Sequence, residues 1–289
     1  MKHDNEATYV TGHVTTQRHR LTEMIWTPSD QNDVSVAITV QSQKALLTDL
    51  RSRMTSRTGF SVATLNLDHV VKLHHSEPFR TAYGQQTHVS ADGRPIVWLS
   101  YCAGRNVELV TGSDLVEPMM RLCAEMSVPI ALLGSTNAVL ETVAKTVTKR
   151  YPGLTIATTI APPMGFDPDA AQADTLLGDL ARSGARVCFL ALGAPKQEIL
   201  AARGLKACPQ MGFLSVGASL DFIAGTQTRA PRIVRAVGME WAWRLLCNPR
   251  RLAARYGACL LILPRLLARA LHTRRTNAHR DPVKHSGPS

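Results

Sequence analysis

Short apolar runs of strand length alternate with longer stretches of helical spacing along most of this chain. The strand-like runs are Val34–Val40, Phe60–Asn66, Val128–Leu133, Leu154–Ile160, Val187–Leu192 and Phe213–Val216. The helix-like stretches are Gln43–Thr55, Asp68–His75, Asn137–Tyr151, Asp169–Ser183 and Pro195–Arg203. Strands that alternate with helices predict βαβ units with parallel strands. We therefore expect an α/β fold: a Rossmann-like, mostly parallel sheet with flanking helices.

The pattern divides the chain into four regions. Residues 1–33 are a polar lead-in with little to bury and without the apolar core of a signal peptide. Residues 34–232 carry the alternation and are long enough to form one domain with a substantial core. Residues 233–271 have helical spacing, and we call them the basic appendage. Residues 272–289 are expected to form a disordered basic tail.

The excess positive charge is confined to the end of the chain. The formal net charge is +11, and residues 229–289 hold 13 Lys and Arg against 2 acidic residues. Residues 1–228 therefore contain equal numbers of basic and acidic residues. This distribution predicts an anionic partner for the basic end alone.

The basic appendage combines this charge with apolar side chains. Arg244 and Arg251 fall on related helical turns, two tryptophans lie close by, and Pro249 and Pro264 are expected to break the helix. Its purely apolar run is far shorter than the ~18–20 residues of a membrane span. A helix of this kind suits the plane of an anionic membrane surface. The alternative is a helix packed on the body with a solvated basic face.

The sequence predicts neither a disulfide framework nor a metal site. Six cysteines are scattered without a Cys-x-x-Cys pair, which is typical of reduced thiols in a cytosolic protein. Asp167-Pro168-Asp169 resembles a metal-binding acidic pair. An Asp before Pro ahead of a helix is also the pattern of an N-cap with proline at the first helical position. We interpret Asp167 as that cap and expect no metal.

The segment Leu192–Glu198 joins a strand-like run to a helix start. Gly193 would allow a ligand to approach closely, Pro195 suits the first helical turn, and Gln197 can donate and accept hydrogen bonds. Ligands of open α/β sheets bind at such strand ends, where helix N–H groups favour an anion such as a nucleotide pyrophosphate. The alternative is an ordinary strand-to-helix turn.

Other strand ends carry polar residues within reach of a ligand. Thr64 and Asn66 alternate with apolar neighbours, so both side chains leave the same face of one strand. Gly134 and Ser135 form a turn that suits a ribose or a phosphate. Asp92, held before a glycine, can act as a general base on a sugar hydroxyl, although a plain Asp-Gly turn is the commoner explanation of this motif taken alone.

Asp68 and His69 begin the helix that follows the Thr64 strand. We interpret Asp68 as the N-cap of that helix and His69 as structural rather than as a catalytic base. The chain contains neither the dinucleotide-binding fingerprint nor the P-loop pattern. We therefore expect no cofactor.

Several segments together resemble the WecG/TagA/CpsF family, glycosyltransferase family 26. They are TLNLDH (64–69), ADG (91–93), VTGSDL (110–115), LLGS (132–135), LGAPKQE (192–198), VGASLDFIAGTQTRAP (216–231) and GMEWAWRLLCNPRRLAARY (238–256). They occur in family order, and LGAPKQE and the last segment are the most specific. The chain departs from the family at Leu109, where an Arg is usual. Either Arg105 substitutes, or the donor phosphate is held differently.

The resemblance implies an inverting, metal-independent glycosyltransferase with residues 34–232 as its catalytic domain. It would transfer a sugar from a UDP-sugar to a polyprenyl-diphosphate-linked saccharide at the cytoplasmic face of the bacterial plasma membrane. The residues that it implies are Asp92 as base, Thr64 and Asn66 beside it, Gln197 and the Gly134-Ser135 turn at the nucleotide sugar, and Arg244 and Arg251 over the diphosphate.

The donor sugar stays open at this point. The segments around residues 66–73 and 91–100 look most like the exopolysaccharide branch, which favours a hexose. The alternative is an N-acetylmannosaminyl- or N-acetylmannosaminuronyltransferase of wall or surface polymers. From other classes, a nucleic-acid-binding protein would use the basic end as its footprint, and a cytosolic α/β enzyme would act on a soluble nucleotide. A homo-oligomer is also compatible with the sequence.

Overall fold

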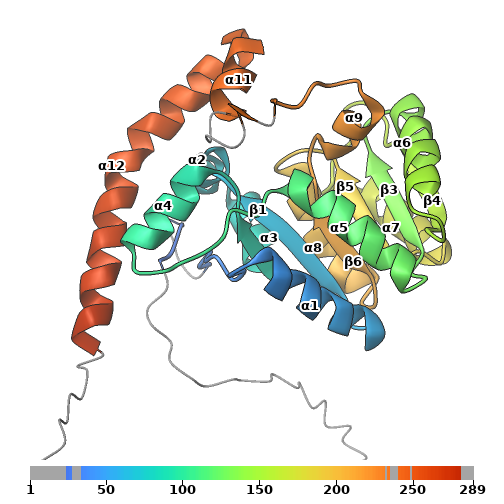
Figure 1. Cartoon of the computed structure of the whole chain (residues 1–289), viewed down its shortest axis with the longest axis horizontal. Helices are drawn as coiled ribbons and strands as arrows, with labels where there is room; N and C mark the ends of the chain where they lie inside the picture. Colours follow the sequence, from blue (N-terminus) through green and yellow to red (C-terminus); the bar gives the residue numbers. More distant parts are fainter. Residues whose placement is uncertain (1–23, 28–33, 232, 235–239, 248, 281–289) are drawn as a thin grey trace, which may run out of the picture.

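The structure, a computed structural model, contains a sheet of six parallel strands flanked by helices (Figure 1). It describes residues 24–27, 34–231, 233–234, 240–247 and 249–280. The strands are β1 Phe60–Leu65, β2 His88–Ala91, β3 Ile130–Gly134, β4 Ile156–Ile160, β5 Val187–Ala191 and β6 Gly212–Ser215. Their order across the sheet is β2-β1-β6-β5-β3-β4. The expected α/β class is confirmed.

Helices cover both faces of this sheet. The helices of the described residues are α1 Gln43–Thr55, α2 Leu67–His75, α3 Glu77–Gly84, α4 Arg94–Cys102, α5 Gly112–Glu125, α6 Asn137–Arg150, α7 Ala171–Arg182, α8 Lys196–Ala207, α9 Ser219–Ala224, α11 Glu240–Cys247 and α12 Pro249–Arg280. α1, α5 and α6 pack with the largest core cluster on one face, and α7 and α8 pack on the other.

The chain reverses its direction of travel across the sheet between β3 and β5. β3 leads through α6 to β4, whereas its neighbour β5 leads through α8 to β6 on the other side. Accordingly α6 and α8 lie on opposite faces. Open α/β sheets bind ligands at the carboxyl ends of strands near such a reversal. The topology therefore directs attention to the loops that follow β3, β5 and their neighbours.

Apolar sequence, rather than burial alone, explains which strands the sequence pattern revealed. Every residue of β1, β3, β5 and β6 is buried, as expected for parallel strands covered on both faces, and such strands have continuous apolar sequences. The predicted strand Val34–Val40 is wrong. Its burial alternates, but the N–H groups of Thr39 and Val40 both donate to the Val89 carbonyl, so no ladder continues. β2 lies at one edge of the sheet and is also fully buried, but its short sequence HVSA contains no apolar run.

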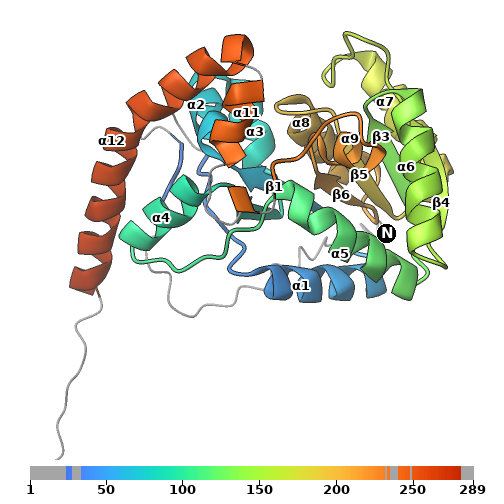
Figure 2. The same ribbon diagram turned by 45° about the horizontal axis from the view of Figure 1, so that its top comes forward.

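The basic appendage lies against the β2 end of the sheet. α12 packs on α2 and α4 (Figures 1 and 2), and Leu266 and Ala270 are 1% and 0% exposed there. The expected break at Pro264 does not occur, because α12 continues from Pro249 to Arg280. Residues on both sides of Pro264 are buried against the body, and this packing stabilises the helix by more than the loss of the hydrogen bond that proline removes. No helix in the described part of the chain has the length and apolarity of a membrane span.

The ends of the chain also differ from expectation. Residues 272–280, expected in a disordered tail, form the last turns of α12, and residues 281–289 lie outside the described part. Met24 and Trp26, expected in a lead-in with little to bury, are 4% and 1% exposed. They belong to the core cluster of α2, α4 and α12. Isolated apolar residues in a polar segment gave no periodic signal.

Leu266→Ala is expected to lower the free energy of unfolding by roughly 2–5 kcal/mol, because it leaves a cavity where a buried side chain was. Urea unfolding of the full chain measures this. Leu261 lies on the same helix and is 84% exposed, so Leu261→Ala should stay within about 0.5 kcal/mol of the wild type. Equal losses for the two variants would contradict the packing of α12 on the body.

Candidate active site

The register of β1 and β2 brings two polar residues together at the carboxyl edge of the sheet. Leu65 pairs with Ala91, so Asn66 and Asp92 follow at the same edge. Asp92 is half-buried, and its Oδ2 accepts a hydrogen bond from Thr64 Oγ1 at 3.2 Å. The Asp92 N–H also donates to the Leu65 carbonyl at 2.8 Å. These contacts hold a carboxylate at the strand ends, where a ligand is expected.

Asn66 is the N-cap of α2. Its Oδ1 accepts from the His69 N–H at 3.0 Å, so the prediction that Asp68 caps this helix is wrong. Asn66 lies two residues before Asp68, and its extended backbone places its side chain over the free N–H groups at the start of the helix. Asn66 therefore fixes the start of α2 beside Asp92.

Asp68 instead binds the basic appendage. Its two oxygens accept from Arg255 Nε at 2.9 Å and Nη2 at 2.5 Å, and Lys72 Nζ lies 2.9 Å from Oδ2. Burial alone would raise the pKa of Asp68, but hydrogen bonds from Arg255 and Lys72 outweigh it and hold the pKa at about 2. A bidentate ion pair thus ties α12 to the helix that follows β1.

This ion pair predicts how stability depends on pH. The pKa of Asp68 is lowered in the folded chain, so its contribution is present above the unfolded value of 3.8 and is lost as the pH falls through about 2. Asp68→Asn is therefore expected to cost at most about 2 kcal/mol at pH 7. In urea unfolding, the difference between wild type and variant should shrink as the pH falls below about 4. A difference that stays constant from pH 7 to pH 2.5 would contradict this role.

A buried hydrogen-bonded group supports β1 from behind. The Tyr83 hydroxyl donates to the Thr64 carbonyl at 2.9 Å, and its oxygen lies 2.8 Å from His69 Nδ1. Burial lowers the pKa of His69 to about 4, so His69 is neutral at pH 7 and structural, as expected. Burial, then Glu198 and Asp92, raise the pKa of Tyr83 well above its usual value. Both carboxyl groups therefore lie near the same hydroxyl.

The turn between β5 and α8 carries Gly193 and Gln197. Gly193 has φ +70, and a Cβ there would meet nothing within 4 Å. Gln197 is 4% exposed. Its Oε1 accepts from the Gly217 N–H at 3.1 Å, and its Nε2 donates to Glu198 Oε1 at 2.8 Å. Gln197 therefore holds the turn after β6 in place rather than extending into solvent.

The turn after β3 is held to its neighbours in the same way. Gly134 has φ +118, and a Cβ there would lie 2.3 Å from the Ala191 carbonyl oxygen, so only glycine fits. Ser135 donates from Oγ to Asp221 Oδ1 at 2.9 Å and from N–H to Ala191 O at 3.3 Å. The loops after β3, β5 and β6 thus form one connected edge.

Three polar residues of this edge were missed in the sequence. Lys72 donates to the Ala194 carbonyl at 3.2 Å, beside the β5–α8 turn. Glu198 is 0% exposed, and Asp221 holds Ser135. The four-residue spacing of Asp68 and Lys72 on one helix was a usable signal. No sequence signal pointed to Glu198, because an acidic residue in the first turn of a helix ordinarily lies in solvent and interacts favourably with the helix dipole.

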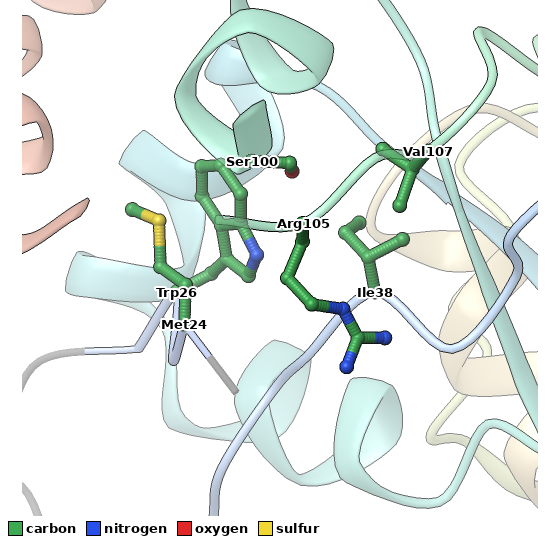
Figure 3. A pocket seen from close by; sticks show the side chains of 6 residues that line it. All are labelled: Met24, Trp26, Ile38, Ser100, Arg105 and Val107. Carbon is green, nitrogen blue, oxygen red and sulfur yellow. The ribbon is translucent and has the colours of Figure 1, made fainter. Parts of the chain in front are cut away.

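We do not expect Arg105 to take the place of an arginine at position 109. It follows the far end of α4, a helix of nine residues whose axis is roughly 13 Å long, whereas Leu109 bridges to Ala91. Figure 3 shows Arg105 lining a small pocket with Trp26 and Ile38. The cavity volume is about 10 Å³, room for about one water. The geometry favours the alternative in which other groups hold the donor phosphate.

The acidic pair around Pro168 also differs from expectation. α7 begins at Ala171, with Ala170 at the cap position and no capping side chain. Asp167 Oδ1 instead accepts from the Asp169 N–H at 3.0 Å in a turn before the helix. Among the described residues, no group of three or more His, Cys, Asp or Glu could hold a metal ion.

Arg244 and Arg251 belong to α11 and α12, but their side chains lie outside the described residues. Their approach to the carboxyl edge therefore stays a prediction. What the structure shows is that α12 reaches α2 through Arg255 and Asp68. The appendage that carries both arginines is anchored to the helix that begins beside Asp92.

Comparison with known families supports the resemblance seen in the motifs. The sequence model of the glycosyl transferase WecG/TagA/CpsF family matches residues 32–280. This match spans the whole sheet, both turns that Gln197 connects, and α12 to its end. It therefore includes every candidate site residue, and the chain is a member of the WecG/TagA/CpsF family of glycosyltransferases.

Proposed function

We propose that this glycosyltransferase transfers a sugar from a UDP-sugar to a polyprenyl-diphosphate-linked saccharide, with Asp92 as the general base. The observation that carries the proposal is the position of Asp92. It is half-buried at the carboxyl edge, directly after β2, and is held by Thr64. β1 lies between β2 and β6, and β6 leads to the turn that Gln197 holds.

The proposed reaction is a single displacement that inverts the anomeric carbon. Asp92 takes the proton of the acceptor hydroxyl while that oxygen attacks the anomeric carbon. The bond from this carbon to the UDP oxygen breaks, and negative charge grows on the departing diphosphate. Arg244 and Arg251 are proposed to stabilise that charge. The reaction as proposed requires no metal.

The donor is proposed to lie along the loops after β3, β5 and β6. A Cβ at Gly193 or Gly217 would meet nothing within 4 Å, so a ligand can approach both turns closely. Asp221 and Ser135 supply polar groups for the nucleotide at the β3 end. Lys72, which donates to the Ala194 carbonyl, supplies a cation beside the β5–α8 turn and is proposed to compensate in part for Leu109.

The acceptor is proposed to come from a membrane, at the inner face of the bacterial plasma membrane. Leu260 and Leu261 of α12 are 66% and 84% exposed, and exposed Trp241 of α11 is a residue type that lies at headgroup level. Together with the positive charge of the appendage, they support an anionic leaflet as partner. A hexose donor for exopolysaccharide assembly is proposed first, and UDP-N-acetylmannosamine or its uronic acid second.

UDP release tests the function. The purified full-length chain is incubated with a panel of UDP-sugars and short-chain prenyl-diphosphate saccharides. We expect release with one donor class, dependent on the prenyl-diphosphate acceptor and unaffected by a chelator. Equal release with a lipid-free acceptor would contradict the proposed acceptor, and no release with any donor would contradict the function. Flotation with anionic liposomes tests the membrane partner, and binding to DNA instead would contradict it.

A further inference from the structure

Glu198 is a carboxyl group that the proposed mechanism does not use. It lies in the first turn of α8 and is 0% exposed. Its Oε2 is buried and has no hydrogen-bond partner among the described residues, whereas Oε1 accepts from Gln197 Nε2 at 2.8 Å. Burying an acid is costly unless it is neutralised or paired. A surface glutamate at a helix start would avoid this cost, so the burial of Glu198 calls for a role inside the protein.

The contacts of Glu198 determine the orientation of the Gln197 amide. A glutamine amide has an acceptor at one end and donors at the other. Here Glu198 takes the donor end, which leaves Oε1 of Gln197 for the Gly217 N–H at 3.1 Å. If the amide were flipped, its NH2 group would face the Gly217 N–H, and both hydrogen bonds would be lost.

Gln197 contacts the turn that leads to the loops proposed to bind the UDP-sugar. Gly217 lies in the turn between β6 and α9, with φ +57 and open space in front of it. α9 begins two residues later and carries Asp221, which binds Ser135 after β3. One continuous set of contacts therefore runs from Glu198 to the loops proposed to hold the nucleotide.

We infer that Glu198 is a positioning residue for the UDP-sugar: through Gln197 it holds the Gly217 turn in the conformation that receives the donor. This inference rests on the proposed function. Burial raises the pKa of Glu198 to about 7, opposed by the Gln197 hydrogen bond and by Lys72. A neutral acid keeps the carbonyl oxygen that Gln197 requires, and a glutamine at this position would keep it too.

The test compares Michaelis constants for donor and acceptor. Glu198→Ala is expected to raise the KM for the UDP-sugar about tenfold and to leave the KM for the prenyl-diphosphate acceptor within about twofold. Glu198→Gln should stay within about threefold of the wild type for both. In a Gln197→Ala background, Glu198→Ala should add less than about twofold, because its effect passes through that amide.

Other results would overturn the inference. They are equal increases in both KM values, an undiminished effect of Glu198→Ala without Gln197, or no rescue by Glu198→Gln. If Glu198→Ala does not fold, Glu198→Asp replaces it, because the shorter side chain keeps the carboxyl but withdraws Oε1 from Gln197. A wild type that neither binds nor uses any UDP-sugar would overturn the proposed function itself. If the wild type has normal kinetics but the effects of Glu198→Ala and Gln197→Ala on the KM for the UDP-sugar are additive, only the role of Glu198 is overturned.

Discussion

Asp92→Asn is expected to fold like the wild type and to lose roughly 10²–10⁴-fold in kcat, the usual contribution of a general base. Asparagine has nearly the same shape, and its oxygen can still accept from Thr64 Oγ1, the contact seen at 3.2 Å. It cannot take a proton at neutral pH, so the acceptor hydroxyl would remain unactivated. Steady-state UDP release gives kcat, and calorimetry with UDP shows whether donor binding survives.

Two further variants make this result interpretable. Asp169 is exposed and outside the site, so Asp169→Asn should stay within about twofold of the wild type. Thr64→Val removes one hydrogen bond to Asp92 and should cost less than Asp92→Asn itself. Retention of most activity by a folded Asp92→Asn variant would remove Asp92 from the role of base.

Arg244→Ala and Arg251→Ala are each expected to lower kcat by about 10²–10³-fold, the usual effect of removing one group that stabilises developing negative charge. The reason is the charge that grows on the departing UDP in a reaction proposed to proceed without a metal. Binding of UDP in the ground state should weaken much less. Steady-state kinetics on the lipid-linked acceptor separates the two effects.

Arg250 supplies the matched control for these arginines. It lies on α12 and is exposed, so Arg250→Ala changes the charge of the appendage by the same amount without touching the proposed site. We expect it to stay within about threefold of the wild type on acceptors in detergent. If Arg250→Ala and Arg251→Ala had equal effects, general charge rather than a specific contact would be responsible.

Point variants test the appendage better than its deletion does. Removing residues 234–289 would be expected to release an inactive body if the appendage were a separate membrane anchor. We do not expect the body to remain folded after this deletion, because Leu266 and Ala270 are buried in the core with Leu73 and Leu99. Deletion would expose that core, and lost activity could then reflect unfolding alone.

The sequence predicted the parts of the fold that depend on local pattern. The helix Gln43–Thr55 was predicted with the bounds observed, and buried strands such as β5 stood out as apolar runs. β2 was missed, since a polar edge strand has no such run. The continuation of α12 through Pro264 was missed because tertiary packing, not propensity, decides it.

The candidate site was predicted to a similar extent. The end of β1 before Asn66 could be located from the pattern, whereas the end of β2 before Asp92 could not. It is the parallel register of the two strands that brings Asp92 and Asn66 to the same edge. The partners of each side chain could not be located in this way. That Asn66 rather than Asp68 caps α2, and that Gln197 is buried between Glu198 and Gly217, follows from contacts between distant segments.

The central claim is that UDP binds along the carboxyl ends of β5 and β6, next to Asp92. Backbone hydrogen exchange of the full-length protein with and without UDP tests it most directly. We predict slower exchange in residues 192–198 and 216–221 when UDP is present, and no change in residues 100–107 at the small pocket of Figure 3. Slowing confined to residues 100–107, with none at the two turns, would contradict the account.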